Sequence, residues 1–345
     1  MDEQKQPEKA KSRGCMVWVC VAVLSVFLFI SVMVNLFQGM ALVVKDATNR
    51  AGAGTDEFPA FERMSSWGDP DGIPVVRIAI NGVIMRQSSG SLFMPQIDKI
   101  ELILDQIRAA TQDEDVKAII VEVNSPGGGV TASDEIYAAL MRFKKDDDTR
   151  KIIVYMKDLA ASGGYYVAIA GDWLIAEPTS IIGSIGVIMQ AVNWSEFTKK
   201  HGITDTTIKS GANKDLLNPF QEVTEEQKAI LQELVDSMYK RFFALVAKGR
   251  SMDSEKLKPH ADGRVFDAER ALDLGFIDEI GYWEDVVAKT EALLGEKVNI
   301  LRYERKTDFM EILAGVETPV EINAGIQFPD PMQTGSPHLL YLWRP

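Results

Sequence analysis

KIIVYMKDLAASGGYY, residues 151–166, is the stretch that decides the fold and frames the candidate site. Its first part, Lys151–Met156, is apolar and rich in β-branched residues, which is typical of a buried strand. Ser162 follows, with alanine before it and two glycines after it, and it opens a second apolar segment, Ser162–Ala170. This pattern predicts a strand, a turn and a buried helix, with Ser162 as an exposed nucleophile at the helix N-terminus. The helix dipole and free backbone N–H groups at that position can stabilise an oxyanion.

A glycine-rich segment upstream also follows a predicted strand. Val116–Val123 is apolar, and Ser125-Pro126-Gly127-Gly128-Gly129 follows it closely. Glycines leave a backbone N–H unobstructed by side chains, so this segment can supply a second oxyanion donor. Together the two segments predict the core of an acyl-transfer site.

The order of the remaining segments predicts an α/β fold. Apolar strands alternate with helical segments of ten to fifteen residues, which implies βαβ units on a mostly parallel sheet. The predicted strands are 75–80, 116–123, 151–156 and 173–176, and the predicted helices are 96–111, 131–145, 162–170, 194–201, 224–248 and 284–294. Thr224–Gln227 carries the residues of a capping box at the start of the longest helix. From Asn299 onward the pattern predicts no particular structure.

The N-terminal region predicts a membrane anchor. No charged residue occurs between Arg13 and Lys45, and Cys15–Phe37 is long enough to span a bilayer as a helix. A cleaved signal peptide is the alternative, but its apolar core is usually only about 7–15 residues long. Three basic residues, Lys9, Lys11 and Arg13, lie just before the span. This cluster predicts a cytoplasmic N-terminus and an extracytoplasmic main domain.

The sequence divides into five regions. They are a cytoplasmic N-terminus (1–14), a transmembrane anchor (15–37), a linker rich in Gly, Pro, Ser and acidic residues (38–74), the main domain (75–298) and a C-terminal extension (299–345).

Charge and cysteine content exclude several classes of function. Residues 1–45 carry five basic and three acidic side chains, a net charge of +2. The whole chain has a net charge of −13, so the remaining residues carry −15. This acidity argues against nucleic acid as a partner. Both cysteines, Cys15 and Cys20, lie in the predicted span, so the main domain has no disulfide, cysteine nucleophile or Cys–zinc site.

A serine nucleophile needs a base, and the sequence offers two kinds. The three histidines, His201, His260 and His338, lie in charged or turn-rich surroundings that are unlike a buried active site. Lysine is the other base that serine hydrolases use, provided that it is neutral. Lys209 follows Ile208 in a β-like run and precedes a Ser-Gly pair, whereas Lys214 has Asp215 beside it to hold its proton.

The order of these motifs resembles that of the signal peptide peptidase A family. The motifs are a single membrane span, NSPGG (Asn124–Gly128), AASGGYY (Ala160–Tyr166), GSIGV (Gly183–Val187) and KSGxxKD (Lys209–Asp215). Members are membrane-anchored serine–lysine peptidases with the repeated ββα units of Clp protease subunits and crotonases. The NSPGG motif (Asn124–Gly128) also resembles the Clp protease subunit, but no histidine occurs about two dozen residues after Ser162, where that enzyme has its catalytic histidine.

The resemblance implies a role for each site residue. Ser162 is the expected nucleophile, Lys209 the general base, Gly128 and Gly163 the oxyanion donors, and Ser184 the residue that orients the lysine amine. A homo-oligomeric ring is implied, with serine and lysine from neighbouring protomers, and so are apolar peptide substrates at the cell membrane. No metal or cofactor is implied. Two alternatives stay open: a non-catalytic membrane-anchored scaffold of the crotonase-like fold, and an acyl-CoA enzyme of that fold, which would need neither Ser162 nor an anchor.

Overall fold

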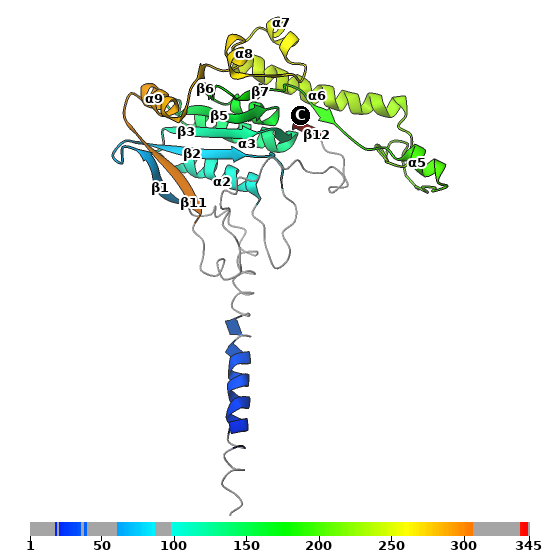
Figure 1. Ribbon diagram of the computed structural model, residues 1–345, viewed down its shortest axis with the longest axis horizontal. Helices are drawn as coiled ribbons and strands as arrows, with labels where there is room; N and C mark the ends of the chain where they lie inside the picture. The colour runs from blue at the N-terminus through cyan, green and yellow to red at the C-terminus, as the bar shows by residue number, and fades with distance from the viewer. Residues whose placement is uncertain are drawn as a thin grey trace, which may run out of the picture. The chain divides into compact units, whose positions relative to one another are not determined.

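Four strands lie side by side in the order in which their apolar segments occur along the chain. A computed structural model of the 345-residue protein describes residues 18, 21–35, 38–39, 61–86, 98–305 and 339–343. In it β2 (Ile73–Asn81), β3 (Ala118–Ser125), β5 (Lys151–Ala161) and β6 (Trp173–Ala176) are parallel neighbours in one sheet (Figure 1). A mixed α/β fold with a central sheet, as predicted, is therefore confirmed.

Further strands extend this sheet at both edges. The full order is β1-β11-β2-β3-β5-β6-β10, with β7 paired to β5 and β9 paired to β7. The added strands are β1 (Phe61–Gly68), β7 (Ile181–Gly183), β9 (Val265–Phe266), β10 (Glu279–Ile280) and β11 (Val298–Arg305). Only the β1–β11 and β7–β9 pairs are antiparallel in the main sheet as described.

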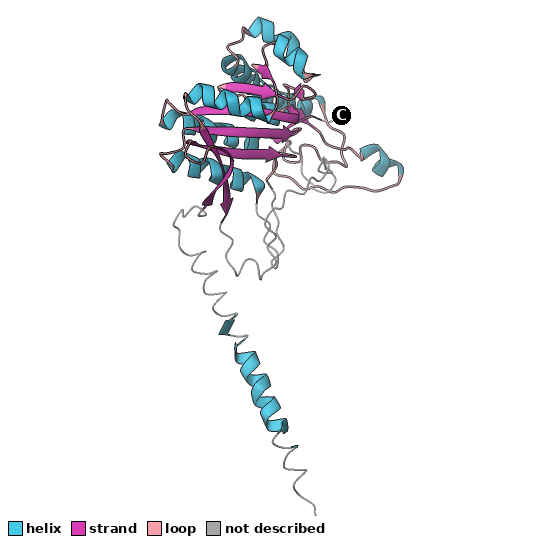
Figure 2. Cartoon of the chain, turned by 60° about the vertical axis from the view of Figure 1, so that its left-hand side comes forward, coloured by secondary structure: helices cyan, strands magenta, loops and turns pink. Residues whose placement is uncertain are grey.

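Helices cover both faces of the sheet (Figure 2). Because successive side chains of a strand point to opposite faces, Ile119 and Val121 of β3 join the core cluster that includes α2 (Lys99–Gln112) and α3 (Val130–Asp146). Ile120 instead packs in a second cluster with Val286 and Val287 of α9 (Trp283–Leu294). The central strands are thus buried on both sides, which explains why their sequences are continuously apolar rather than alternating.

The main domain extends further than the sequence predicts at each end. Strand β1 lies within the stretch predicted as a linker, and β11 lies almost entirely beyond the predicted boundary at 298. Nearly all of β1 is exposed, so it has no apolar pattern to detect, and it is a strand because it pairs with β11. The edge contact between the rings of Trp67 and Trp283, 6.5 Å between centroids, fastens it to α9.

The C-terminal half adds helices and two strands of a small second sheet. It contains α5 (Ser195–Lys200), α6 (Glu225–Gly249), α7 (Ser254–Leu257), the 3₁₀ helix η1 (Lys258–His260) and α8 (Ala268–Asp273). The capping box predicted for α6 is present, with Thr224 and Gln227 each accepting from the other's backbone N–H. The second sheet has the order β4-β12-β8, formed by β4 (Gly127–Gly129), β8 (Ile188–Met189) and β12 (Leu339–Leu342).

The N-terminal region forms a compact unit of its own, Met1–Glu57, separate from Phe58–Pro345. Residues 21–35 are helical, and their side chains are exposed. Within the described part of the chain, no helix combines the length and the apolar character that crossing a membrane requires. Both ends of the predicted span, residues 15–17 and 36–37, lie outside the described residues.

Candidate active site

Ser162 occupies a strained turn between β5 and the short helix α4 (Gly163–Ala168). Its φ of 54° and ψ of −114° lie in a region that residues with a Cβ rarely adopt. Hydrogen bonds hold the turn on both sides: Ser162 N donates to Gly183 O (2.7 Å) and Tyr166 N donates to Ser162 O (2.8 Å). A serine on a sharp strand-to-helix turn projects its hydroxyl away from both elements, which is the arrangement of nucleophilic serines in other hydrolases. Strain of this kind is concentrated at functional sites.

The expectation that Ser162 is exposed is wrong for this chain. The residue is 1% exposed. The reason lies in the packing around the turn, because α4, which begins at the next residue, lies against α3, β4 and β12.

Two tyrosines fix α4 in place. The Tyr165 hydroxyl donates to the carbonyl of Phe276 (2.8 Å), and burial raises the pKa of Tyr165, which keeps it a neutral donor. The Tyr166 hydroxyl donates to Asp134 Oδ1 (2.6 Å), which also accepts from Arg241 of α6 (2.6 Å). The sequence did not predict these contacts, although both tyrosines lie in the same segment as Ser162, residues 151–166.

The backbone N–H of Gly128 is directed to the side of β4 on which β12 pairs with it. On the other side of β4, Ile84 N donates to Gly127 O (2.9 Å) and Gly129 N donates to Ile84 O (2.7 Å). Because N–H groups alternate in direction along a strand, the N–H of Gly128 points away from Ile84. A Cβ on Gly128 would lie 2.1 Å from Ile84 O, so only glycine fits at this position.

Gly163 lies against Gly128. A Cβ on Gly163 would lie 3.1 Å from Gly128 N and 2.5 Å from the hydroxyl oxygen of Ser133. As the first residue of α4, Gly163 has an N–H without a partner inside the helix. The structure therefore brings the two predicted oxyanion residues together beside Ser162. It also places the buried Ser133, which the sequence did not single out, next to them, with its hydroxyl donating to Gly129 O (3.0 Å).

Alanine substitutions at Gly128 and Gly129 should show whether glycine is required at Gly128 alone, where a Cβ would collide with Ile84 O, or at both positions. We expect Gly128→Ala to lower kcat about 100-fold, because the backbone must move by roughly an ångström, and to destabilise the fold by about 2 kcal/mol. At Gly129 a Cβ would meet nothing closer than 3.7 Å, so Gly129→Ala should stay near the parent in activity and thermal unfolding. Equal losses in both variants would contradict this assignment.

Ser184 lies beside Ser162 because two parallel strands end together. Ala161 and Gly183, the last residues of β5 and β7, are paired with each other. The residue that follows each strand is a serine, so Ser162 and Ser184 lie at the same level of the sheet. Ser184 also has a positive φ, 53°, and its N donates to Arg264 O (2.8 Å). It is 6% exposed.

Lys209 lies in another part of the domain. It belongs to the irregular segment between α5 and α6, and the portion of the chain that carries α5 extends away from the sheet in Figure 1. Its Nζ is 2.6 Å from Asp215 Oδ1, and none of the hydrogen bonds or ion pairs of the described residues joins it to Ser162. The expectation that Asp215 holds a proton on Lys214 is wrong, since this carboxylate pairs with Lys209.

The histidines show no link to Ser162. His201 lies at the end of α5 with its ring 4.4 Å from that of Phe197, and the His260 ring is 6.1 Å from that of Phe266. Neither donates to or accepts from Ser162 in the described part of the structure. His338 lies outside the described residues.

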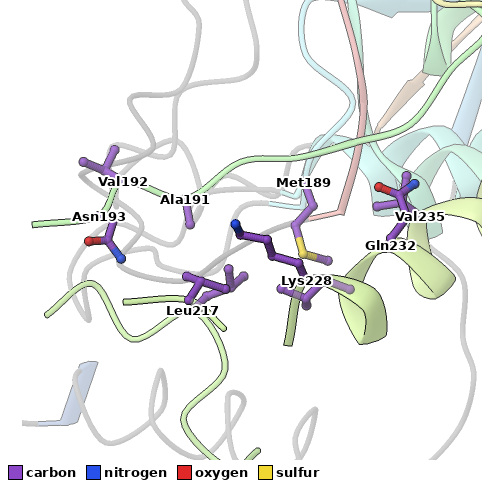
Figure 3. Close-up of a pocket in the computed structure, with 10 residues that line it drawn as sticks. Met189, Ala191, Val192, Asn193, Leu217, Lys228, Gln232 and Val235 are labelled. Carbon is purple, nitrogen blue, oxygen red and sulfur yellow. The ribbon is translucent and has the colours of Figure 1, made fainter. Parts of the chain in front are cut away.

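An apolar pocket of about 380 Å³ opens beyond β8 (Figure 3). It lies between the segment that follows Met189, the loop residue Leu217 and the first turns of α6. Leu231 and Val235 supply its wall on α6, and Lys228 is the charged residue that lines it. Pockets of this size with mainly apolar walls are typical of sites that bind apolar groups.

Comparison with known proteins gives two family matches that overlap at this site. The model for "Peptidase family S49" matches residues 144–297, and the model for "Clp protease" matches residues 89–183. A putative signal peptide peptidase SppA of Enterococcus faecium is 36% identical over 274 residues, which are 78% of this chain and 78% of the relative. The chloroplastic serine protease SPPA of Arabidopsis thaliana is 29% identical over 77% of this chain and 40% of its own length. Protease 4 of Haemophilus influenzae is 31% identical over 68% of this chain and 37% of its own length.

Proposed function

Since this chain belongs to the signal peptide peptidase A family of serine peptidases, peptidase family S49, we propose that it cleaves apolar peptides, including released signal peptides, with a Ser162–Lys209 dyad. The single observation that carries the proposal is the strained turn that sets Ser162 beside the N–H groups of Gly163 and Gly128. A scaffold without catalysis would have no use for backbone strain at a serine.

In the proposed reaction Lys209, once it has left Asp215 and is neutral, takes the hydroxyl proton of Ser162 as the serine oxygen attacks the peptide carbonyl. The N–H groups of Gly128 and Gly163 hold the tetrahedral oxyanion, and each such donor is typically worth about 3 kcal/mol. The protonated lysine then gives its proton to the leaving amine, and water hydrolyses the acyl-enzyme. Ser184 orients the amine of this lysine, and the support for this role is that its strand ends level with that of Ser162.

We propose that Lys209 reaches Ser162 of a neighbouring protomer in a ring. Two observations support this arrangement. Lys209 is bound to Asp215 in the extended segment rather than to the serine of its own chain. That segment also exposes large apolar side chains, among them Ile208 (96% exposed), Ile203 (55%) and Phe197 (54%), which a second copy of the chain would cover.

The proposed location is the cell membrane, with a single span in residues 15–37 and the catalytic domain on the extracytoplasmic side. The support is the uncharged apolar sequence between Arg13 and Lys45, and the helical conformation of residues 21–35 with exposed apolar side chains such as Phe27 and Leu28. Roughly 20 apolar residues suffice to span a bilayer as a helix.

The substrate class can be tested at the apolar pocket. Leu231 lines the pocket, whereas Leu234 of the same helix is exposed and does not line it. We expect Leu231→Asp to raise KM for an apolar fluorogenic peptide about tenfold, since removing one buried apolar contact costs roughly 1–3 kcal/mol. Leu234→Asp is the matched control, and an equal rise in KM for both variants would remove the pocket from the substrate path.

The proposed activity itself is tested with detergent-solubilised full-length protein and apolar fluorogenic peptides. Hydrolysis, together with labelling of Ser162 by a serine-directed phosphonate, is the expected result. Absence of both hydrolysis and labelling would favour the scaffold alternative instead.

A further inference from the structure

Asp134 connects the two helices that begin beside the proposed oxyanion donors. Helix α3, which carries Asp134, begins directly after Gly129, the last residue of β4. Helix α4, which carries Tyr166, begins directly after Ser162. Each of the two residues lies roughly one turn from the start of its helix. The hydrogen bond from the Tyr166 hydroxyl to Asp134 Oδ1 (2.6 Å) therefore joins the two helices close to their N-termini.

Arg241 adds a third element, α6, to this contact. Its Nε and Nη2 donate to Asp134 Oδ1 at 3.0 Å and 2.6 Å, and Nε also lies 3.1 Å from the Tyr166 hydroxyl. The next residue of α6, Phe242, packs its ring against that of Tyr166, with 5.0 Å between the centroids. Both rings are fully buried. Hydrogen bonds to an ionised acceptor are roughly twice as strong as neutral ones, so the carboxylate of Asp134 is the anchor of this network.

The network acts on the spacing between Gly128 and Gly163. The two residues are close neighbours, since a Cβ on Gly163 would lie 3.1 Å from Gly128 N. Helix α4 has only 6 residues, and a helix this short has no stable orientation of its own, so tertiary contacts must supply it. Oxyanion donors must lie about 2.7–3.1 Å from the developing charge. A shift of α4 relative to α3 and β4 would therefore take one donor out of range.

We propose that Asp134 is a positioning residue for peptide hydrolysis, which acts through Tyr166 and Arg241 to hold α3 and α4 at the spacing where Gly128 and Gly163 both donate to the oxyanion. The proposal rests on the proposed function, because it takes these two N–H groups as the oxyanion donors. The oxyanion forms only as the serine attacks, so loss of the network lowers kcat and leaves KM nearly unchanged. A misplacement of about 1 Å at a reacting centre costs about 100-fold in rate.

The kinetic test uses full-length protein in detergent and an apolar fluorogenic peptide. We expect Asp134→Ala to lower kcat about 100-fold and Tyr166→Phe, which keeps the buried ring, to lower it about tenfold. Asp134→Asn keeps an acceptor oxygen in the same place, so it should restore kcat to within about threefold of the parent. Lys240→Ala is the control, because Lys240 is an exposed neighbour of Arg241 on α6. A rise in KM at unchanged kcat, or equal losses in Asp134→Ala and Asp134→Asn, would overturn the proposal.

Counting the active sites separates positioning from a general loss of folded protein. Each variant is labelled to completion with a serine-directed phosphonate, and kcat is expressed per labelled site. We expect Asp134→Ala to label as many chains as the parent and to turn over more slowly at each labelled site. Fewer labelled chains with an unchanged kcat per labelled site would show that Asp134 only stabilises the fold, and would overturn the proposal.

Hydrogen exchange separates this proposal from the proposed function, because it needs no turnover. We expect the backbone N–H groups of residues 163–168 to exchange about tenfold faster in Asp134→Ala than in Lys240→Ala, while those of β2 exchange equally in both. If the parent neither hydrolyses peptides nor takes the label, the proposed function fails, and faster exchange in α4 still supports its positioning by Asp134. Unchanged exchange in α4 overturns the proposal whatever the kinetics show.

Discussion

Ser162→Ala should abolish peptide hydrolysis, with a fall in kcat on the order of 10⁶-fold. The hydroxyl is the proposed attacking group, and no other serine shares its position at the strained turn in the described chain. Hydrolysis of an apolar fluorogenic peptide measures the loss, and labelling by a serine-directed phosphonate should disappear with it. The serine side chain makes no capping hydrogen bond to α4, so thermal unfolding of the variant should differ little from the parent.

Ser162→Gly is the matched control for strain. Glycine adopts a φ of 54° without the steric conflict that a Cβ causes, so this variant should be about 1 kcal/mol more stable than Ser162→Ala. Both variants should be inactive. Residual turnover in Ser162→Ala would show that another residue is the nucleophile, and equal stability of the two variants would show that the turn stores no strain.

Lys209→Ala should lower kcat by a factor on the order of 10⁴ to 10⁶, because without the base the serine proton has no acceptor. Lys214→Ala is the matched control, since it removes the same charge from the same irregular segment and should leave turnover close to the parent. Steady-state kinetics on the apolar peptide and the oligomeric state by light scattering are measured together. Activity of Lys209→Ala with loss in Lys214→Ala would exchange the two assignments.

The sequence predicted the central sheet well because the strands carry their own signal. β3 and β5 are buried on both faces, so their residues are continuously apolar, and the helices between them show helical spacing. The turn at Ser162 also has a local signal in the sequence, since a small residue and two glycines mark the point where the strand ends and the helix begins.

Elements that depend on distant partners were not predictable. β1 is a strand through its pairing with β11, more than two hundred residues away, and its own residues are mostly exposed. β12 similarly owes its conformation to β4 and β8. The contact of Ser133 with the glycines arises from the approach of α3 to α4, which no local pattern in the sequence reports.

Lys209 is bound within its own segment and not to Ser162 of the same chain. Its motif pointed to a base, yet its partner within the chain is Asp215, because the segment that carries it extends away from the sheet. A site completed between protomers accounts for both facts, and the exposed apolar side chains of that segment are consistent with an interface.

The most direct test of the shared dyad is a mixture of two inactive variants. Ser162→Ala and Lys209→Ala chains with different tags are co-expressed and purified as mixed oligomers through both tags. Each complete site then joins Ser162 of one variant to Lys209 of the other, and random equal mixing in a ring should restore about a quarter of the parent turnover per protomer. Mixed oligomers that remain as inactive as either variant alone would contradict a dyad shared between neighbouring protomers.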